Sequence, residues 1–164
     1  MMGEPNCKEI SMFSRISLKT ESLLSKKDLW IAKFPSKYDT KDIAAWEYIA
    51  YKLALKAGIE MSESKLQKVS GNFHTFFTKR FDRINGERIH FASAMTMTGK
   101  NESTIKDETP SYIDLAEFIQ FACNKSEKDL HQLWRRIVFN IAISNTDDHL
   151  RNHGYIVKDG QWKL

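Results

Sequence analysis

The sequence predicts an α+β fold in which a β-rich first half precedes a helical second half. Short apolar segments separated by turn residues occupy the region between residues 29 and 91. Two segments with apolar residues at helical spacing follow, between residues 113 and 141. A loop rich in Asn and Asp then leads into a final hairpin, so the predicted order is strand, helix, strands, helices, acidic loop and hairpin.

The first half contains a predicted strand, a helix and a hairpin. Residues 29–34 form a short apolar run closed by Pro35 and Ser36, which indicates a strand. A helix begins near residue 41 and ends at Gly58, a typical C-cap residue. Its predicted buried face consists of Ile43, Trp46, Ile49, Ala50 and Leu53.

A hairpin is predicted next. Residues 76–81 and 87–91 are strand-like, and Asn85-Gly86 between them favours a tight turn. A polar loop is expected over residues 99–112.

The second half contains two predicted helices and a second hairpin. The first helix covers about residues 113–123, and a hairpin around Asp159-Gly160 closes the chain. The second helix carries one apolar face, made of Leu130, Leu133, Trp134, Ile137, Val138 and Ile141. All four tryptophans fall on predicted apolar faces and are expected in the core: Trp30, Trp46, Trp134 and Trp162.

Composition is that of an ordinary globular protein, with 41% hydrophobic and 28% charged residues. The net charge of +4 suits an anionic ligand, although an ordinary basic surface explains it equally well. There is no apolar run of 18 residues and no signal-peptide pattern, so no membrane association is expected. Cys7 and Cys123 do not form a disulfide framework, which is typical of a cytoplasmic protein.

The most informative segment runs from Asn140 to Asn152 and is unusually rich in side chains that carry chemistry. Asp147 and Asn152 stand five residues apart, which allows a carboxylate to accept a hydroxyl proton while an amide oxygen binds magnesium. His149 can orient the loop or contact a phosphate, and Asp148 can cap a turn. The alternative is an Asx-rich turn whose side chains only satisfy backbone donors.

Two further segments can contribute to a phosphate site. Lys33 ends the first strand, and Glu47 lies one turn into the following helix, where it can pair with Lys33. Each residue taken alone is more often an ordinary surface residue. Residues 78–81 can lie beside a nucleotide base, or they can simply be a core strand.

These motifs, in this order, resemble the HipA family of bacterial serine/threonine kinases, the toxins of HipA/HipB-type toxin-antitoxin modules. The resemblance covers residue 29 to the C-terminus and is most specific in the last motif. The matching segments are Trp30-Ile-Ala-Lys33-Phe-Pro, Trp46-Glu47-Tyr, Arg80-Phe-Asp82-Arg83, Arg88-Ile-His-Phe and Asn140-x4-Asn145-Thr-Asp147-Asp148-His149-x2-Asn152.

The resemblance implies a kinase-like fold with a small β-rich lobe and a helical lobe, and with ATP and Mg²⁺ as ligands. It divides the chain into a degenerate phosphate-loop region (1–28), a nucleotide-binding lobe with one helix (29–98) and a helical lobe with the catalytic loop and the hairpin (99–164). The family assigns Asp147 as catalytic base, Asn152 as magnesium ligand, Lys33 (with Glu47) and His149 beside the phosphates, and Lys79, Arg80 and Phe81 as the hinge at the adenine.

The expected partners also follow from the resemblance. They are a HipB-like antitoxin and a protein substrate such as an aminoacyl-tRNA synthetase, with DNA contacted only through the antitoxin complex.

Two departures from the family pattern indicate a central fragment with weak activity or none. No glycine occurs between Gly3 and Gly58, so no phosphate-loop residue is assigned among residues 11–17. The chain also ends at Leu164, before the family's second metal-binding aspartate. A non-catalytic pseudokinase that binds an antitoxin is therefore the alternative. A metal-dependent phosphohydrolase built on Asp147, Asp148 and His149 ranks third.

Overall fold

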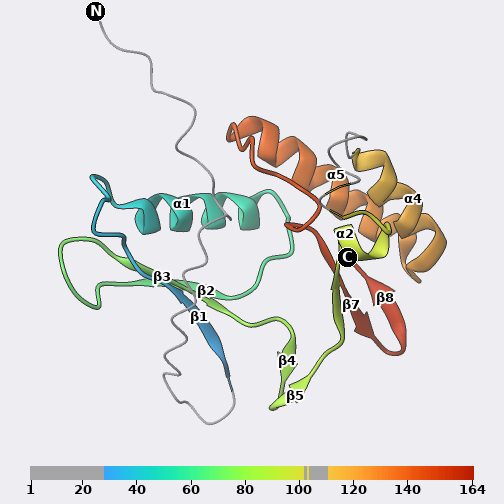
Figure 1. Ribbon diagram of the computed structural model, residues 1–164, viewed down its shortest axis with the longest axis horizontal. Coiled ribbons are helices and arrows are strands. Elements are labelled where there is room, and N and C mark those ends of the chain that lie inside the picture. Colours follow the sequence, from blue (N-terminus) through green and yellow to red (C-terminus); the bar gives the residue numbers. More distant parts are fainter. Residues whose placement is uncertain (1–27, 102, 104–110) are drawn as a thin grey trace, which may run out of the picture.

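The computed structural model describes residues 28–101, 103 and 111–164, so the predicted phosphate-loop region lies outside the described residues. Its elements confirm a mixed α and β architecture (Figure 1). No helix in the described part of the chain combines the length and apolar character needed to cross a membrane. In chain order the elements are β1 (Trp30–Lys33), α1 (Ile43–Lys56), β2 (Ser64–Gln67), β3 (Thr75–Lys79), β4 (Arg83–Ile84), β5 (Glu87–Arg88), β6 (Phe91–Ser93), α2 (Ala94–Met97), α4 (Tyr112–Ala122), α5 (Ser126–Ala142), β7 (Gly154–Lys158) and β8 (Gln161–Lys163).

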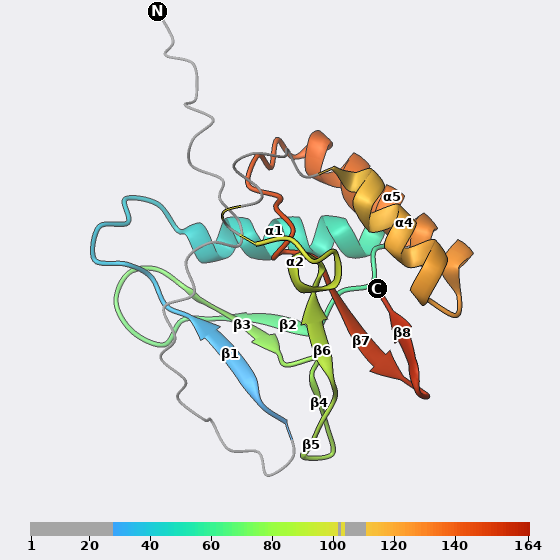
Figure 2. The ribbon, with the colours of Figure 1, turned by 45° about the vertical axis from the view of Figure 1, so that its right-hand side comes forward.

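The first half is an antiparallel sheet with strand order β1-β3-β2 and helix α1 packed on one face (Figure 2). In the register of β1 and β3, Lys33 stands opposite Phe76. Asp42 caps α1 by accepting a hydrogen bond from the Ala45 N–H at 3.2 Å. The core between helix and sheet is a small cluster of Ala44, Tyr51 and Phe76, joined by Tyr48 and Leu66.

The hairpin predicted between residues 76–81 and 87–91 is wrong in its pairing. Both edges of β3 are taken, by β1 and by β2, so β3 has no edge left for a third strand. The Asn85-Gly86 turn does form, with φ values of 53° and 87°, but it joins only the two-residue strands β4 and β5. Strand β2 was not predicted, because Ser64-Lys-Leu-Gln67 contains a single apolar residue.

The second half packs α2, α4 and α5 with a sheet of order β6-β7-β8. Tyr155, Leu115 and Ile119 are almost wholly buried at its centre. Strand β6 pairs with β7, and Ala94 of α2 belongs to this same core, so both elements pack with the second half. Gly154 allows the close approach of β6 to β7, because a Cβ there would lie 2.2 Å from the Phe91 ring.

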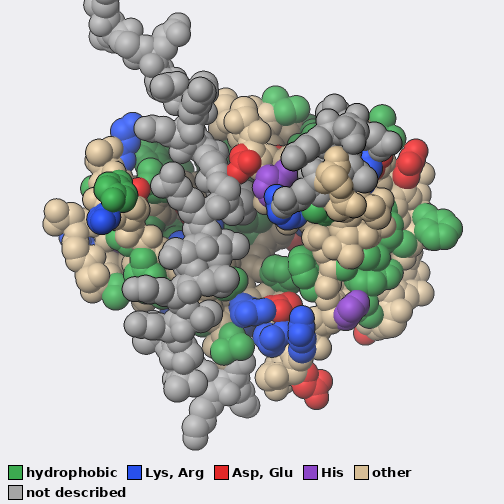
Figure 3. Space-filling model, in the orientation of Figure 1, with side chains coloured by type: hydrophobic (Ala, Val, Ile, Leu, Met, Phe, Trp, Pro, Cys, Tyr) green, Lys and Arg blue, Asp and Glu red, His purple; other side chains and the backbone are tan. Residues whose placement is uncertain are grey.

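The predicted core faces of the two long helices are partly wrong. Trp46 on α1 is 65% exposed and Trp134 on α5 is 63% exposed, whereas Trp30 and Trp162 are half-buried. Apolar side chains accordingly reach the surface (Figure 3). Ala50 on α1 and Leu133 on α5 are buried as predicted. The other fully buried positions were not predicted: Ala44, Tyr51 and Ala54 on α1, and Asp129 and Gln132 on α5. Apolar periodicity indicates a helix, but here it identified the covered face only in part, since Leu130 and Ile137 also pack against the core.

Candidate nucleotide site

The first part of the site is an ion pair between the sheet and helix α1. Lys33 ends β1 and Glu47 lies in the second turn of α1, and the Lys33 Nζ donates to Glu47 Oε1. Both side chains are mostly buried, with 19% and 13% of their side-chain surface exposed. Burial raises the pKa of the Glu47 carboxyl, and the Lys33 ammonium opposes that rise. The helix therefore fixes the direction of a cation at the end of a strand, an arrangement used to hold phosphate oxygens.

The second part is the segment that leaves β3, predicted as the hinge. The Lys79 N–H donates to the Glu63 carbonyl and the Arg80 N–H to the Leu29 carbonyl, both at 2.8 Å, so the sheet uses these two donors. Of the three hinge residues, Phe81 alone has a backbone N–H that donates to no acceptor within the described part of the chain. If an adenine edge is read here by a backbone N–H, Phe81 is the residue that supplies it.

The side chains of the same segment are held by neighbours rather than directed at a ligand. Arg80 donates from Nε and Nη2 to the two carboxylate oxygens of Asp82, at 2.8 and 2.6 Å. These bonds hold the pKa of Asp82 below its ordinary value. Lys79 Nζ lies 2.8 Å from Asp28 Oδ2. The half-exposed Phe81 ring packs edge-on against Phe91, with centroids 5.3 Å apart, and presents an apolar face beside the hinge.

The third part is the loop between α5 and β7, which passes beside α1 in both ribbon views (Figures 1 and 2). Helix α5 stops where Ser144 adopts a left-handed φ of 57°. Asn145 then ties the loop to the helix: its N–H donates to the Asn140 carbonyl at 2.8 Å and its Nδ2 donates to Asn140 Oδ1 at 3.1 Å. Asn145 Oδ1 in turn accepts the Asp147 N–H at 3.2 Å. The two asparagines thus shape the loop, as the turn interpretation predicts.

Asn152 is oriented toward the same turn. Its Nδ2 donates to the Asp147 carbonyl at 2.6 Å, and its N–H donates to the His149 carbonyl at 2.8 Å. The amide nitrogen is thereby engaged, and the oxygen Oδ1 is the atom left to act as a ligand. An amide oxygen fits Mg²⁺, which binds few protein groups and keeps water and phosphate oxygens as its other ligands. In the described residues, no group of three or more His, Cys, Asp or Glu side chains is arranged to hold a metal ion.

Asp148 is the buried centre of the loop. Its Oδ2 accepts hydrogen bonds from Asn140 Nδ2 and Tyr112 OH, both at 2.7 Å, and lies 3.0 Å from His153 Nε2. The side chains of Asp148 and His153 are 7% and 4% exposed. Burial alone would raise the pKa of Asp148, but the hydrogen bonds from His153, Tyr112 and Asn140 outweigh it and leave the pKa below its ordinary value.

Tyr112 and His153 were not predicted as site residues. His153 directly follows Asn152 in the motif, which is a signal that could have pointed to it. Tyr112 comes from α4, distant in sequence, and no spacing links it to the loop. His149, which was predicted, is exposed, so the loop's buried histidine is His153.

A strand lysine paired with a helix glutamate, and an Asn- and Asp-rich loop that follows a long helix, are features of a kinase-like fold. The chain belongs to the HipA-like C-terminal domain family, whose model matches residues 14–164. No curated protein matches it.

Among solved structures, it is similar to a chain of the Shewanella oneidensis MR-1 toxin-antitoxin complex of HipA, HipB and operator DNA. The identity is 20% and the TM-score 0.68, over 82% of this chain and 35% of that chain. This chain therefore spans about a third of the length of that relative, and a likeness at this identity shows the fold alone.

Proposed function

We propose that this chain supplies the nucleotide site and the catalytic loop of a HipA-like protein serine/threonine kinase. The observation that carries the proposal is the mostly buried Lys33–Glu47 pair, in which helix α1 holds a lysine at the end of a strand. The loop that contains Asp147 and Asn152 passes beside the same helix in both ribbon views. A buried ion pair is costly to maintain for stability alone, and it is explained by a phosphate that binds the lysine.

The roles of the residues follow from their chemistry. Lys33 holds phosphate oxygens of ATP, and Glu47 keeps its ammonium in place. The Phe81 N–H and ring receive the adenine at the hinge. Asp147 takes the proton of the acceptor serine or threonine hydroxyl. Asn152 Oδ1 would hold Mg²⁺, which neutralises charge on the phosphates when bound.

The first test is nucleotide binding. The expected result is a magnesium-dependent rise in melting temperature with ATP, which is lost in Lys33→Ala because the phosphate contact is removed. Lys56→Ala is the control, since Lys56 is an exposed lysine in the last turn of α1 and should leave the rise unchanged. An equal rise in Lys33→Ala would contradict the role of Lys33.

The second test is phosphoryl transfer from radiolabelled ATP. Asp147→Asn should abolish any transfer while the far-ultraviolet circular dichroism spectrum stays that of the parent chain. Transfer that persists in Asp147→Asn would remove this residue from the catalytic role.

The proposed partners rest on the solved relative, whose complex contains HipB and operator DNA. We infer that a protein with this domain binds a HipB-like antitoxin, with DNA reached through that complex and a protein such as an aminoacyl-tRNA synthetase as substrate. Co-expression with a candidate antitoxin followed by size-exclusion chromatography tests the first of these partners.

A non-catalytic interaction module is the second candidate, and one observation favours it. No glycine lies between Gly3 and Gly58, ahead of the Lys33 strand, although backbone approach to phosphates there ordinarily needs glycine. A chain that shows no magnesium-dependent shift with ATP, and yet binds the antitoxin, would establish this second candidate.

A further inference from the structure

Gln132 is a buried amide that bridges the two halves of the molecule. It lies on α5 and is 5% exposed. The nitrogen and the oxygen of its side-chain amide both form hydrogen bonds with backbone groups just beyond α1. Nε2 donates to the Gly58 carbonyl at 3.0 Å, and Oε1 accepts the Glu60 N–H, also at 3.0 Å. A glutamine that reaches two backbone groups two residues apart fixes both the position and the direction of that segment.

The segment to which Gln132 bonds, residues 58–60, is firmly joined to the end of α1. The Ala57 N–H donates to the Leu53 carbonyl at 2.9 Å, and the Ile59 N–H donates to the Ala54 carbonyl at 3.0 Å, so residues 57–59 continue the last turn of the helix. Ile59 is 5% exposed, which anchors the segment further. A movement at Gly58 is therefore a movement of α1.

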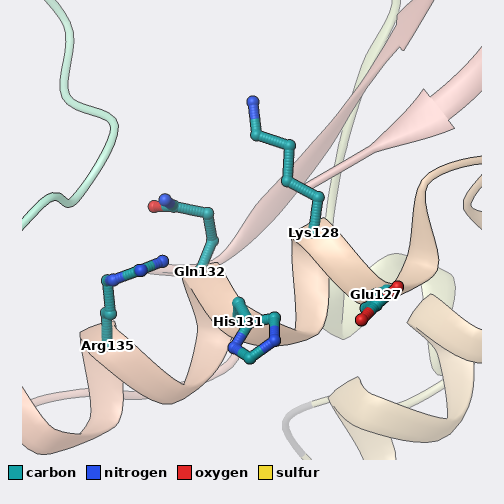
Figure 4. Close-up of a pocket in the computed structure, with 5 residues that line it drawn as sticks. All are labelled: Glu127, Lys128, His131, Gln132 and Arg135. Atoms are coloured by element: carbon teal, nitrogen blue, oxygen red, sulfur yellow. The ribbon is translucent and has the colours of Figure 1, made fainter.

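Glu60 adds two ion pairs from the second half of the chain. Its carboxylate lies 2.5 Å from Lys128 Nζ and 2.7 Å from Lys163 Nζ. The bonds from Lys128 and Lys163 lower the pKa of Glu60 to about 2. Figure 4 shows Lys128, Gln132 and Arg135 leaving the same side of α5, with His131 on another side. These ion pairs are exposed and screened by solvent, whereas the side-chain amide of Gln132, with its two hydrogen bonds, is buried.

The other end of α5 leads to the loop of the candidate site. Gln132, Arg136 and Asn140 stand four residues apart and share one face of a continuous helix. Arg136 is partly buried, and burial lowers its pKa while the negative charge of Asp148 opposes that change. Asn140 donates to Asp148. Helix α5 therefore carries both Gln132, which bonds to the end of α1, and Asn140, which belongs to the network that shapes the Asp147 turn.

We propose that Gln132 is a positioning residue: by clamping the C-terminal end of α1 to α5, it sets where the Lys33–Glu47 pair stands relative to the Asp147 loop. This role in phosphoryl transfer rests on the proposed function. The clamp itself fixes the distance between α1 and the helical half, and that distance is measurable without nucleotide.

The test compares Gln132→Met, which keeps the volume of the side chain and removes both hydrogen bonds, with Gln120→Met. Gln120 is an exposed glutamine on α4 and serves as the matched control. Spin labels at Lys52→Cys on α1 and Glu117→Cys on α4, both exposed positions, report the distance between the halves by double electron–electron resonance. Cys7→Ser is added to each variant, and the buried Cys123 is left in place.

The clamp predicts one narrow distance distribution in the parent and in Gln120→Met, and a broadened or displaced one in Gln132→Met. Amide hydrogen exchange at residues 57–60 should accelerate at least tenfold in Gln132→Met only. Where the parent transfers phosphate, kcat should fall about 10- to 100-fold with KM changed less than about threefold, because misplacement costs rate more than binding.

An unchanged distance distribution together with unchanged exchange in Gln132→Met would overturn the proposal, whatever the activity. If Gln132→Met does not fold, Gln132→Glu replaces it, because it keeps an acceptor for the Glu60 N–H and sets a carboxylate oxygen against the Gly58 carbonyl in place of the donor. Parent-like distance and exchange in that variant would overturn the proposal equally. A changed distance in a chain that binds no ATP would support the clamp and contradict only the kinase function.

Discussion

Replacing Asp148 by Asn tests whether the buried network shapes the loop of the candidate site. The change keeps the size of the side chain and removes its charge. Three donors converge on one carboxylate oxygen, namely Asn140 Nδ2, Tyr112 OH and His153 Nε2, at 2.7, 2.7 and 3.0 Å. A hydrogen bond to a charged group contributes about 1.5–3 kcal/mol and a neutral one about 1 kcal/mol.

The substitution weakens three hydrogen bonds, and this loss is partly offset because burying a neutral amide costs less than burying a carboxylate. The net result is a decrease of about 2 kcal/mol in the free energy of unfolding. In a chain of this size that is a fall of about 4–8 °C in melting temperature. Urea unfolding at pH 7 with a common m-value measures it. Asp159→Asn is the control, because Asp159 is exposed in a turn and should change stability by less than about 0.5 kcal/mol.

The pH dependence of this difference has a definite sign. The pKa of Asp148 is lowered in the folded protein from an ordinary value of 3.8. Its contribution to stability is therefore fully present above the unfolded pKa and is lost as the pH falls through the lower, folded pKa. The gap between the parent and Asp148→Asn should shrink as the pH falls below 3.8. A gap under about 0.5 kcal/mol at pH 7 would refute the network's role.

Three further substitutions test single features of the structure. Tyr112→Phe removes one donor to Asp148 and should destabilise the chain by about 1 kcal/mol in urea unfolding; no change would mean that the bond contributes nothing. Gly154→Ala should displace the half-exposed Phe91 ring at a cost of about 1–2 kcal/mol, and this cost should fall in the Phe91→Ala background if the clash causes it. Trp46→Gln should change stability by less than about 1 kcal/mol, and a loss of 3 kcal/mol or more would show that the indole is buried.

The elements that local chemistry determines were predictable from the sequence. Asn85-Gly86 and Asp159-Gly160 both form the hairpin turns that their residues favour, because positive φ at both positions is the requirement of such a turn. The helices α1, α4 and α5 lie close to their predicted bounds. The partner of β3 was not predictable locally, because strand pairing depends on which edges other strands already occupy.

The candidate site was likewise predictable where the local sequence determines it and not where tertiary contacts do. The Asn140–Asn152 motif marks the loop, and the strand–helix order predicts that Lys33 and Glu47 can meet, as they do in the structure. Tyr112 could not be predicted from residue spacing, because it lies far from Asp148 in the sequence and only the packing of α4 brings the two side chains together. Gln132 was missed for a different reason: an apolar stripe was assumed to be the buried face of α5, whereas this buried position carries a polar side chain that bonds to backbone groups.

Photo-crosslinking with 2-azido-ATP tests the central claim most directly, which is that a nucleotide lies between the Lys33–Glu47 pair and the Asp147 loop with its base at the hinge. Mass spectrometry of the labelled peptides should place the label within residues 79–83, with labelling that depends on magnesium, is competed by ATP and is lost in Lys33→Ala. Labelling confined to another part of the chain, or labelling unaffected by Lys33→Ala, would contradict it.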